Sequence, residues 1–192
     1  MSLVLGIDPG HSGAFAVYDT DAQRIATMDD MPTWYQTVTK ARKRPRIDAL
    51  AVADYFDTFE MMGVALIVLE AVGGRPSQGA GAAYVFGYGV GLLYMAGIYS
   101  RIPIETVPPA TWKKLMGIQG KGKADDSAIM QRANELFPLD RDKFLTPRGG
   151  KRVDRAEAAM LAKYGGDYVL RTMGTTTDIE NRLSYRNAVT EL

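Results

Sequence analysis

The stretch Leu3-Val-Leu-Gly-Ile-Asp-Pro-Gly10 decides the fold prediction, because an apolar run ends there at an acid followed by a turn. The run Leu3–Ile7 predicts a buried strand that ends at Asp8. Two further short runs, at residues 14–18 and 23–28, each follow a turn of glycine or polar residues. Short runs separated by such turns predict a three-stranded antiparallel meander.

A second apolar run, Val64–Leu69, shows no alternation and ends at Glu70. Such a run is typical of a central strand buried on both faces, as in parallel sheets. Helical periodicity over residues 47–61 precedes it, and an uncharged helix over 80–98 is expected to cross over to a strand at 102–107. Further helices are expected around Trp112, at 125–136 and at 154–170, with an exposed loop at 34–46. The prediction is one α/β domain over residues 1–170, a mixed sheet with a meander and parallel strands flanked by helices, followed by a C-terminal tail at 171–192.

Composition limits the function classes. Lys plus Arg number 23 and Asp plus Glu 22, so the net charge of +1 does not by itself indicate a nucleic-acid partner. The chain has no cysteine and one histidine, which excludes disulfides, thiolate sites and multi-histidine zinc sites. A bound metal would need oxygen ligands, which favours Mg²⁺ or Mn²⁺. The N-terminus lacks the pattern of a signal peptide, and we expect a cytoplasmic protein of a bacterial or phage-infected cell.

The stretch from Pro76 to Ser100 carries no charge and is long enough to span a bilayer. Its six glycines and four tyrosines favour a buried helix in a protein that does not enter a membrane. Small residues recur at every fourth position, which permits close helix packing. We expect this stripe to form a homodimer interface while the other side of the helix covers the sheet; burial within one monomer is the alternative. The stripe consists of Gly79, Ala83, Gly87 and Gly91.

Two acids, Asp8 and Glu70, each end an apolar strand. If these strands are parallel neighbours, the two carboxylates converge at the carboxyl edge of the sheet, where ligands gather in open α/β folds. A buried carboxylate is costly unless it is solvated, paired or bound to a cation. The alternative is a solvated strand-end acid or a turn-forming residue, since Asp-Pro-Gly is a turn sequence.

A second pair of acids, Asp154 and Glu157, is spaced to lie on one face of the first turn of a helix. The alternative is a helix cap resembling a capping box. The small apolar residues at 158–162 would pack on the sheet and hold both acids near the strand ends. Four converging carboxylates need cations, and two divalent ions are the usual solution for phosphodiester hydrolysis.

The set Gly6-Ile-Asp-Pro-Gly10, Glu70-Ala-Val and Asp154-x-x-Glu157-Ala-Ala resembles the RuvC family of the RNase H-like superfamily. Further matches point to its phage-borne branch, namely Gln78-Gly79, Phe86-Gly87, Trp112-Lys113-Lys114, Gly120-Lys121-Gly122-Lys123 and Leu136-Phe137-Pro138. The resemblance implies a homodimeric endonuclease that binds four-way (Holliday) DNA junctions and nicks two opposing strands symmetrically. It also implies that two Mg²⁺ or Mn²⁺ ions per site are held by Asp8, Glu70, Asp154 and Glu157.

The sequence departs from that family pattern at two places. Glu157 stands where cellular members usually carry aspartate, and no aromatic wedge follows Glu70. Arg75 or a tyrosine is the candidate substitute for that wedge. His11 lies in the turn after Asp8, and we place it outside the catalytic set as a structural residue.

Basic residues cluster in spite of the balanced total charge, and contacts of Lys and Arg with phosphate dominate affinity for DNA. A solvated surface is the alternative for the first cluster, whereas glycines in the Gly-Lys-Gly-Lys loop would let backbone N–H groups approach a phosphate. The predicted DNA-binding residues are Arg42, Lys43, Arg44, Arg75, Lys113, Lys114, Lys121, Lys123, Arg148, Lys151, Arg152 and Arg155.

Three other functions fit parts of the sequence. An actin-like or sugar-kinase-like ATPase shares the Gly-x-Asp-x-Gly opening, but it needs a duplicated domain and a second glycine-rich phosphate loop. A non-catalytic nucleic-acid-binding module would keep the fold and use the acids as caps. A nuclease with the same fold could instead act on flaps, forks or RNA–DNA hybrids.

Overall fold

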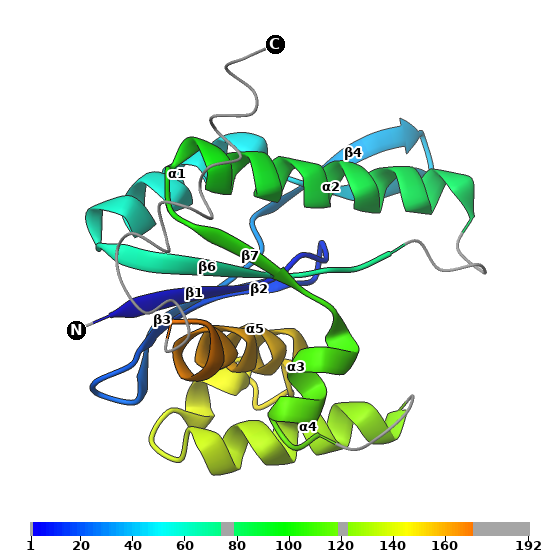
Figure 1. Cartoon of the computed structure of the whole chain (residues 1–192). Helices are drawn as coiled ribbons and strands as arrows, with labels where there is room; N and C mark the ends of the chain where they lie inside the picture. The colour runs from blue at the N-terminus through cyan, green and yellow to red at the C-terminus, as the bar shows by residue number, and fades with distance from the viewer. Residues whose placement is uncertain (1, 74–78, 119–122, 171–192) are drawn as a thin grey trace.

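The computed structural model describes residues 2–73, 79–118 and 123–170, and Figure 1 shows a sheet between two helical layers. The five strands lie in the order β3-β2-β1-β6-β7. The first three pair antiparallel, whereas β1–β6 and β6–β7 are parallel, which confirms the predicted meander and mixed sheet. The bounds are β1 (Leu3–Asp8), β2 (Ala14–Asp19), β3 (Arg24–Asp30), β6 (Val64–Glu70) and β7 (Ile104–Val107).

Each face of the sheet has its own core and its own helices (Figure 1). One face is covered by α1 (Ala49–Met61) and α2 (Ala80–Tyr99). The side chain of Asp48 caps the start of α1 by accepting from the backbone N–H groups of residues 50 and 51. The other face is covered by α3 (Pro109–Leu115), α4 (Lys123–Leu136), the 3-10 turn η1 (Arg141–Phe144), α5 (Val153–Tyr164) and the π-helical turn η2 (Gly165–Val169).

The expectation of an exposed loop at residues 34–46 was wrong. The segment forms a two-stranded antiparallel hairpin of β4 (Thr33–Thr39) and β5 (Arg42–Ile47). Its first strand reads Thr-Trp-Tyr-Gln-Thr-Val-Thr, which is rich in β-branched and aromatic residues that favour strands. The basic residues of β5 obscured this signal in the sequence.

The contact between β1 and α5 depends on Gly6, because the helix backbone lies directly on the strand. A Cβ atom at this position would lie 2.1 Å from the carbonyl oxygen of Ala158 and 2.4 Å from the backbone nitrogen of Ala162. Any side chain at residue 6 would therefore force the helix away from the sheet. The small residues on both sides permit this close approach.

We expect Gly6→Ala to lower the free energy of unfolding by about 3 kcal/mol or more, because overpacking against backbone atoms cannot relax through a side-chain rotation. Urea denaturation followed by circular dichroism measures the change. Gly73→Ala is the matched control, since a Cβ there meets no atom within 4 Å. Equal stability of the two variants would show that α5 can shift on the sheet at little cost.

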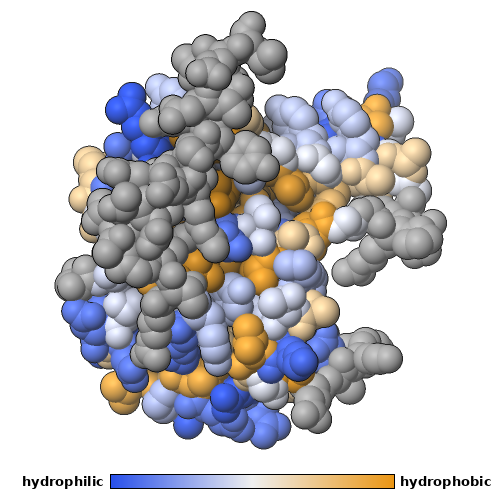
Figure 2. All heavy atoms as spheres, in the orientation of Figure 1, coloured by the Kyte–Doolittle hydropathy of each residue, from blue (hydrophilic) through white to orange (hydrophobic). Residues whose placement is uncertain are grey.

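The expectation of a buried α2 was wrong for most of the helix. Of its residues, only Gly89, Leu93 and Gly97 are buried. By length and composition, α2 is the one helix in the described ranges that could cross a membrane. Its buried side nevertheless packs on the sheet layer, where a Cβ on Gly97 would meet Ile104, Ile67 and Phe56. In Figure 2 the part of this helix that grey atoms do not cover is mostly white, tan and pale blue, with few strongly hydrophobic residues.

Candidate active site

Asp8 and Glu70 lie at adjacent strand ends on one edge of the sheet. The parallel pairing of β1 with β6 sets Ile7 opposite Leu69, so the next residue of each strand is the acid. Glu70 is 8% exposed. The predicted convergence of these two strand ends is therefore confirmed.

The first turn of α5 brings the other two acids to the same edge. The helix begins at Val153, and its N-cap residue is Arg152, which makes no side-chain capping bond. Asp154 and Glu157 thus lie inside the helix, and the capping alternative is wrong. Because Ala158 packs on Gly6 of β1, the start of this helix is held beside the end of that strand.

Asp8 lies within electrostatic range of the other three acids. Burial raises the pKa of Asp8 well above its usual range, and repulsion from Glu157, Asp154 and Glu70 raises it further. Burial also raises the pKa of Glu157, although Lys113 opposes this effect. Burial raises the pKa of Asp154 as well, against a hydrogen bond with Ser12. Like charges at one buried edge raise each other's pKa in this way.

Two neighbouring residues of α3 hold the acids in place. The buried indole of Trp112 donates from Nε1 to Glu70 Oε1 over 2.8 Å. The next residue, Lys113, places Nζ 3.0 Å from Glu157 Oε1 and 2.9 Å from Asp125 Oδ2. Although burial opposes the charge, these two carboxylates raise the pKa of Lys113. Lys113, predicted to bind DNA, is thus a counter-ion of the acid cluster.

The donor set fits a hard divalent cation, because four carboxylates offer only oxygen ligands. However, within residues 2–73, 79–118 and 123–170, no group of three or more acidic or histidine side chains is arranged to hold a metal ion. The expected arrangement of the four acids around a metal site is therefore not formed by the described residues. Glu157 is instead paired with Lys113.

Asp30 is a fifth acid at this sheet edge, and the sequence analysis missed it. It ends β3, where it pairs with Ala14, which in turn pairs with Asp8. Arg155 binds it through two hydrogen bonds, of 2.7 and 3.1 Å, and Nη2 of Arg152 lies 2.8 Å from it. These two predicted DNA-binding arginines therefore join the start of α5 to β3. The sequence signal was an acid at the end of a third strand.

The other predicted DNA-binding residues differ in their surroundings. Four are exposed and free to meet a phosphate from solvent: Lys43, Lys114, Arg148 and Lys151. Arg44 is half-buried against the start of α2, where its Nη1 atom would lie 3.2 Å from a Cβ on Gly81. Arg75, Lys121 and the side chains of Arg42 and Lys123 lie outside the described part of the chain.

The predicted interface stripe lies on the outer side of α2. Gly79, Gly87 and Gly91 are exposed and Ala83 is half-buried, so burial of the stripe within one monomer is wrong. Large apolar side chains flank these residues on the exposed surface, namely Tyr84, Tyr88, Tyr94, Met95, Ile98 and Tyr99. An exposed apolar surface of this kind is typical of an interaction site.

The architecture defines the class of protein: a mixed five-stranded sheet with the RNase H-like arrangement of strands and helices. No protein-family model and no curated protein sequence matches the chain. Among solved structures, RuvC of T. thermophilus in complex with a Holliday junction substrate matches with a TM-score of 0.61 and 15% identity, covering 90% of this chain and 97% of that one. The chain therefore has the fold of RuvC, and the resemblance expected from the sequence is confirmed at the level of the fold.

Two further solved structures are similar. Another structure of Thermus thermophilus RuvC matches with a TM-score of 0.49 and 15% identity, over 90% of this chain and 97% of that one. The yeast mitochondrial Holliday junction resolvase Ydc2 matches with a TM-score of 0.46 and 15% identity, over 99% of this chain and 84% of that one.

We expect Asp8→Asn to stabilise the protein at neutral pH in the presence of a chelator. The pKa of Asp8 is raised in the folded state, so the ionised carboxylate opposes folding above the usual pKa of aspartate. The gain should therefore shrink as the pH falls through the raised pKa, and should vanish below the usual pKa of aspartate, where the carboxyl is neutral in both states. Thermal unfolding at several pH values measures the difference.

Asp57→Asn is the matched control, because Asp57 is exposed on α1. Mg²⁺ should raise the melting temperature of the wild type and of the control but not that of Asp8→Asn, since a ligand stabilises only a protein that binds it. A wild-type protein whose stability does not respond to Mg²⁺ or Mn²⁺ would contradict the assignment of these acids as metal ligands.

Proposed function

We propose that this protein is a metal-dependent endonuclease that resolves four-way DNA junctions by nicking two opposing strands. One observation carries the proposal: four carboxylates meet at one buried edge of the sheet, where Asp8 is repelled by Glu157, Asp154 and Glu70. The fold supports it, because RuvC has the same fold and was solved with a Holliday junction substrate. The expected setting is the cytoplasm of a bacterial or phage-infected cell.

Asp8, Glu70, Asp154 and Glu157 would hold two Mg²⁺ or Mn²⁺ ions in each site. Such ions, when bound, supply an activated water and stabilise the leaving 3′ oxygen. Two side chains of the protein orient these acidic ligands and offset part of their negative charge. Trp112 fixes one oxygen of Glu70 by its hydrogen bond, and Lys113 neutralises Glu157.

Nucleic acid would be bound by the exposed basic residues around this edge. Arg148 and Lys151 precede the start of α5, Lys114 follows the counter-ion Lys113, and Lys43 lies on the hairpin. Each can reach a phosphate without breaking an intramolecular ion pair, in contrast to Arg155. Contacts of this kind give affinity that falls with salt and carries no sequence information.

The functional unit that we propose is a homodimer joined through the outer side of α2. Two opposing strands need two active sites, and a twofold dimer supplies them on one surface. The exposed glycines of α2 would allow a second copy of the helix to approach closely, while the flanking tyrosines supply apolar area. The absence of charged residues from this helix suits burial in an interface.

Asp8→Asn and Glu70→Gln should each reduce junction nicking by roughly 100-fold or more, because each removes an anionic ligand from the metal site. Junction binding should remain, because basic side chains and not anionic carboxylates attract phosphate. A nicking assay on a labelled four-way junction with Mg²⁺, and a gel-shift assay in EDTA, measure the two properties. Asp57→Asn and Glu60→Gln, both exposed on α1, are the matched controls. Cleavage by the two site variants at the wild-type rate would contradict the proposal.

A second function, a non-catalytic nucleic-acid-binding module, is favoured by the ion pair that Lys113 makes with Glu157. Such a module would bind a junction and leave it intact in Mg²⁺ and in Mn²⁺. A side-by-side panel of four-way junctions, forks, flaps and RNA–DNA hybrids separates a junction resolvase from a nuclease with another substrate. Preference for the four-way junction, with paired symmetric nicks, is the outcome expected of the proposed function.

We expect Gly91→Glu to convert the dimer into a monomer, because it would place a buried charge in each half of a twofold interface. The substitution replaces a helical glycine, so the helix itself should not be weakened. Size-exclusion chromatography with light scattering measures the mass. Ala53→Glu on the exposed side of α1 is the control. A wild-type protein that is monomeric at all concentrations tested would rule out this interface.

A further inference from the structure

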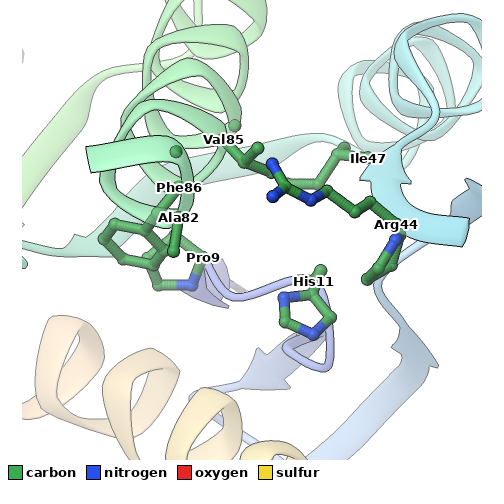
Figure 3. A pocket seen from close by; sticks show the side chains of 10 residues that line it. Pro9, His11, Arg44, Ile47, Ala82, Val85 and Phe86 are labelled. Atoms are coloured by element: carbon green, nitrogen blue, oxygen red, sulfur yellow. The ribbon is translucent and has the colours of Figure 1, made fainter. Parts of the chain in front are cut away.

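A cavity of about 300 Å³ lies beside the acid cluster, on the α1/α2 side of the sheet. Three parts of the chain line it: the turn after β1, the second strand of the hairpin, and the first half of α2. Figure 3 shows Arg44 reaching from β5 towards α2, with Phe86 beside Pro9 and His11 across from them. None of the four acids is among the residues that line this cavity.

The position of the cavity links it to the reaction. Pro9 lines the cavity and directly follows Asp8 in the sequence. The end of β1 therefore contributes one residue to the acid cluster and the next residue to the cavity wall. A DNA strand whose phosphate meets the acids would therefore carry a neighbouring base within reach of this opening. A duplex is far too large for the cavity, whose volume is at the lower end for small-molecule pockets.

The lining has the chemistry that a nucleobase requires. Pro9, Phe86 and Val85 offer apolar surface, and an aromatic ring can stack on any base. His11 offers ring nitrogens that can donate to or accept from a base edge. Arg44 adds a cation that can stack on a base or meet its phosphate.

The glycine at the helix start determines where that cation lies. The guanidinium of Arg44 rests against Gly81, where a Cβ would lie 3.2 Å from Nη1. Further along the helix, Gly89 allows α2 to approach β5, since a Cβ there would lie 2.8 Å from Cδ1 of Ile47. The hairpin and the helix are thus held close enough to enclose the space between them.

We propose that this pocket binds a single unstacked nucleobase of the strand that is cut, one that lies next to the scissile phosphate. The inference rests on the proposed function and gives it a source of sequence preference. Extruding a base costs least where pairing is already disturbed, as at a branch point. A captured base would also hold the junction centre open in a chain that has no aromatic residue directly after Glu70.

The test uses four-way junctions whose cut position has first been mapped with the wild-type protein in Mg²⁺. Each nucleotide within a few positions of the cut is replaced in turn by an abasic residue, and affinity is measured in EDTA, where no cleavage is needed. One replacement should weaken binding by the wild type by roughly 5- to 100-fold, the range expected when one base loses its stacking partner. The same position, labelled with 2-aminopurine, should show a fluorescence change on binding.

Two variants should remove this dependence on one base. Phe86→Ala deletes the stacking surface, and Ala82→Leu fills the cavity from its wall. Both should bind the intact junction about as weakly as the wild type binds the abasic one, and should not discriminate between the two substrates. Ala80→Leu is the control, because Ala80 is exposed on the same helix and does not line the cavity.

The outcomes separate this inference from the function on which it rests. If the wild type nicks the junction but its binding has no abasic-sensitive position, or if the pocket variants keep the wild-type sensitivity, the pocket is overturned and the nuclease is left intact. If the protein nicks in neither Mg²⁺ nor Mn²⁺, the abasic series covers every nucleotide around the branch point instead. One sensitive position there, lost in the pocket variants, would support the pocket and contradict the nuclease.

Discussion

The direct contact between the backbone of β1 and the backbone of α5 determines the geometry of the site. Gly6 leaves no side chain between the strand and the helix, so Ala158 and Ala162 rest on the strand itself. The carboxylates of Asp154 and Glu157 are therefore held next to the strand ends, and the acids cannot move apart to relieve their repulsion without separating the core. Folding energy from the apolar core offsets the cost of placing like charges together.

Three basic residues, one on α3 and two at the start of α5, offset that repulsion unevenly. Lys113 lies between Glu157 and Asp125, whereas Arg152 and Arg155 are bound to Asp30, which is two strands away from Asp8 in the sheet. Burial and the three other acids raise the pKa of Asp8, whereas a backbone hydrogen bond from Gly10 lowers it. Within the described residues, Asp8 makes no ion pair with a cationic side chain, in contrast to Glu157. A divalent cation near Asp8 would therefore supply the positive charge that no side chain supplies there.

The fold could be predicted largely from where apolar runs end. Leu3–Ile7 and Val64–Leu69 are continuous runs closed by an acid, and this pattern indicated the strands, their parallel pairing and the meeting of Asp8 with Glu70. The hairpin at residues 33–47 was missed because basic side chains masked its strand-forming residues. The burial of α2 was overestimated, because hydropathy reports the composition of a helix and not what covers it.

The partners of the acids could not be predicted in the same way. The bonds from Trp112 to Glu70 and from Lys113 to Glu157 join residues more than 40 positions apart, and no periodicity in the sequence encodes them. Asp30 was overlooked because its strand is polar at its end and offers no apolar run to mark it.

The hydrogen bond from Trp112 to Glu70 has an optical consequence. The chain has two tryptophans, and they occupy opposite environments: Trp112 is fully buried against the acids, whereas Trp34 is half exposed on the hairpin. Emission from the first should respond to the charge on its carboxylate partner, and quenching by a solute in water should act chiefly on the second. The fluorescence of Trp112 therefore reports on the acidic site, and no added label is needed.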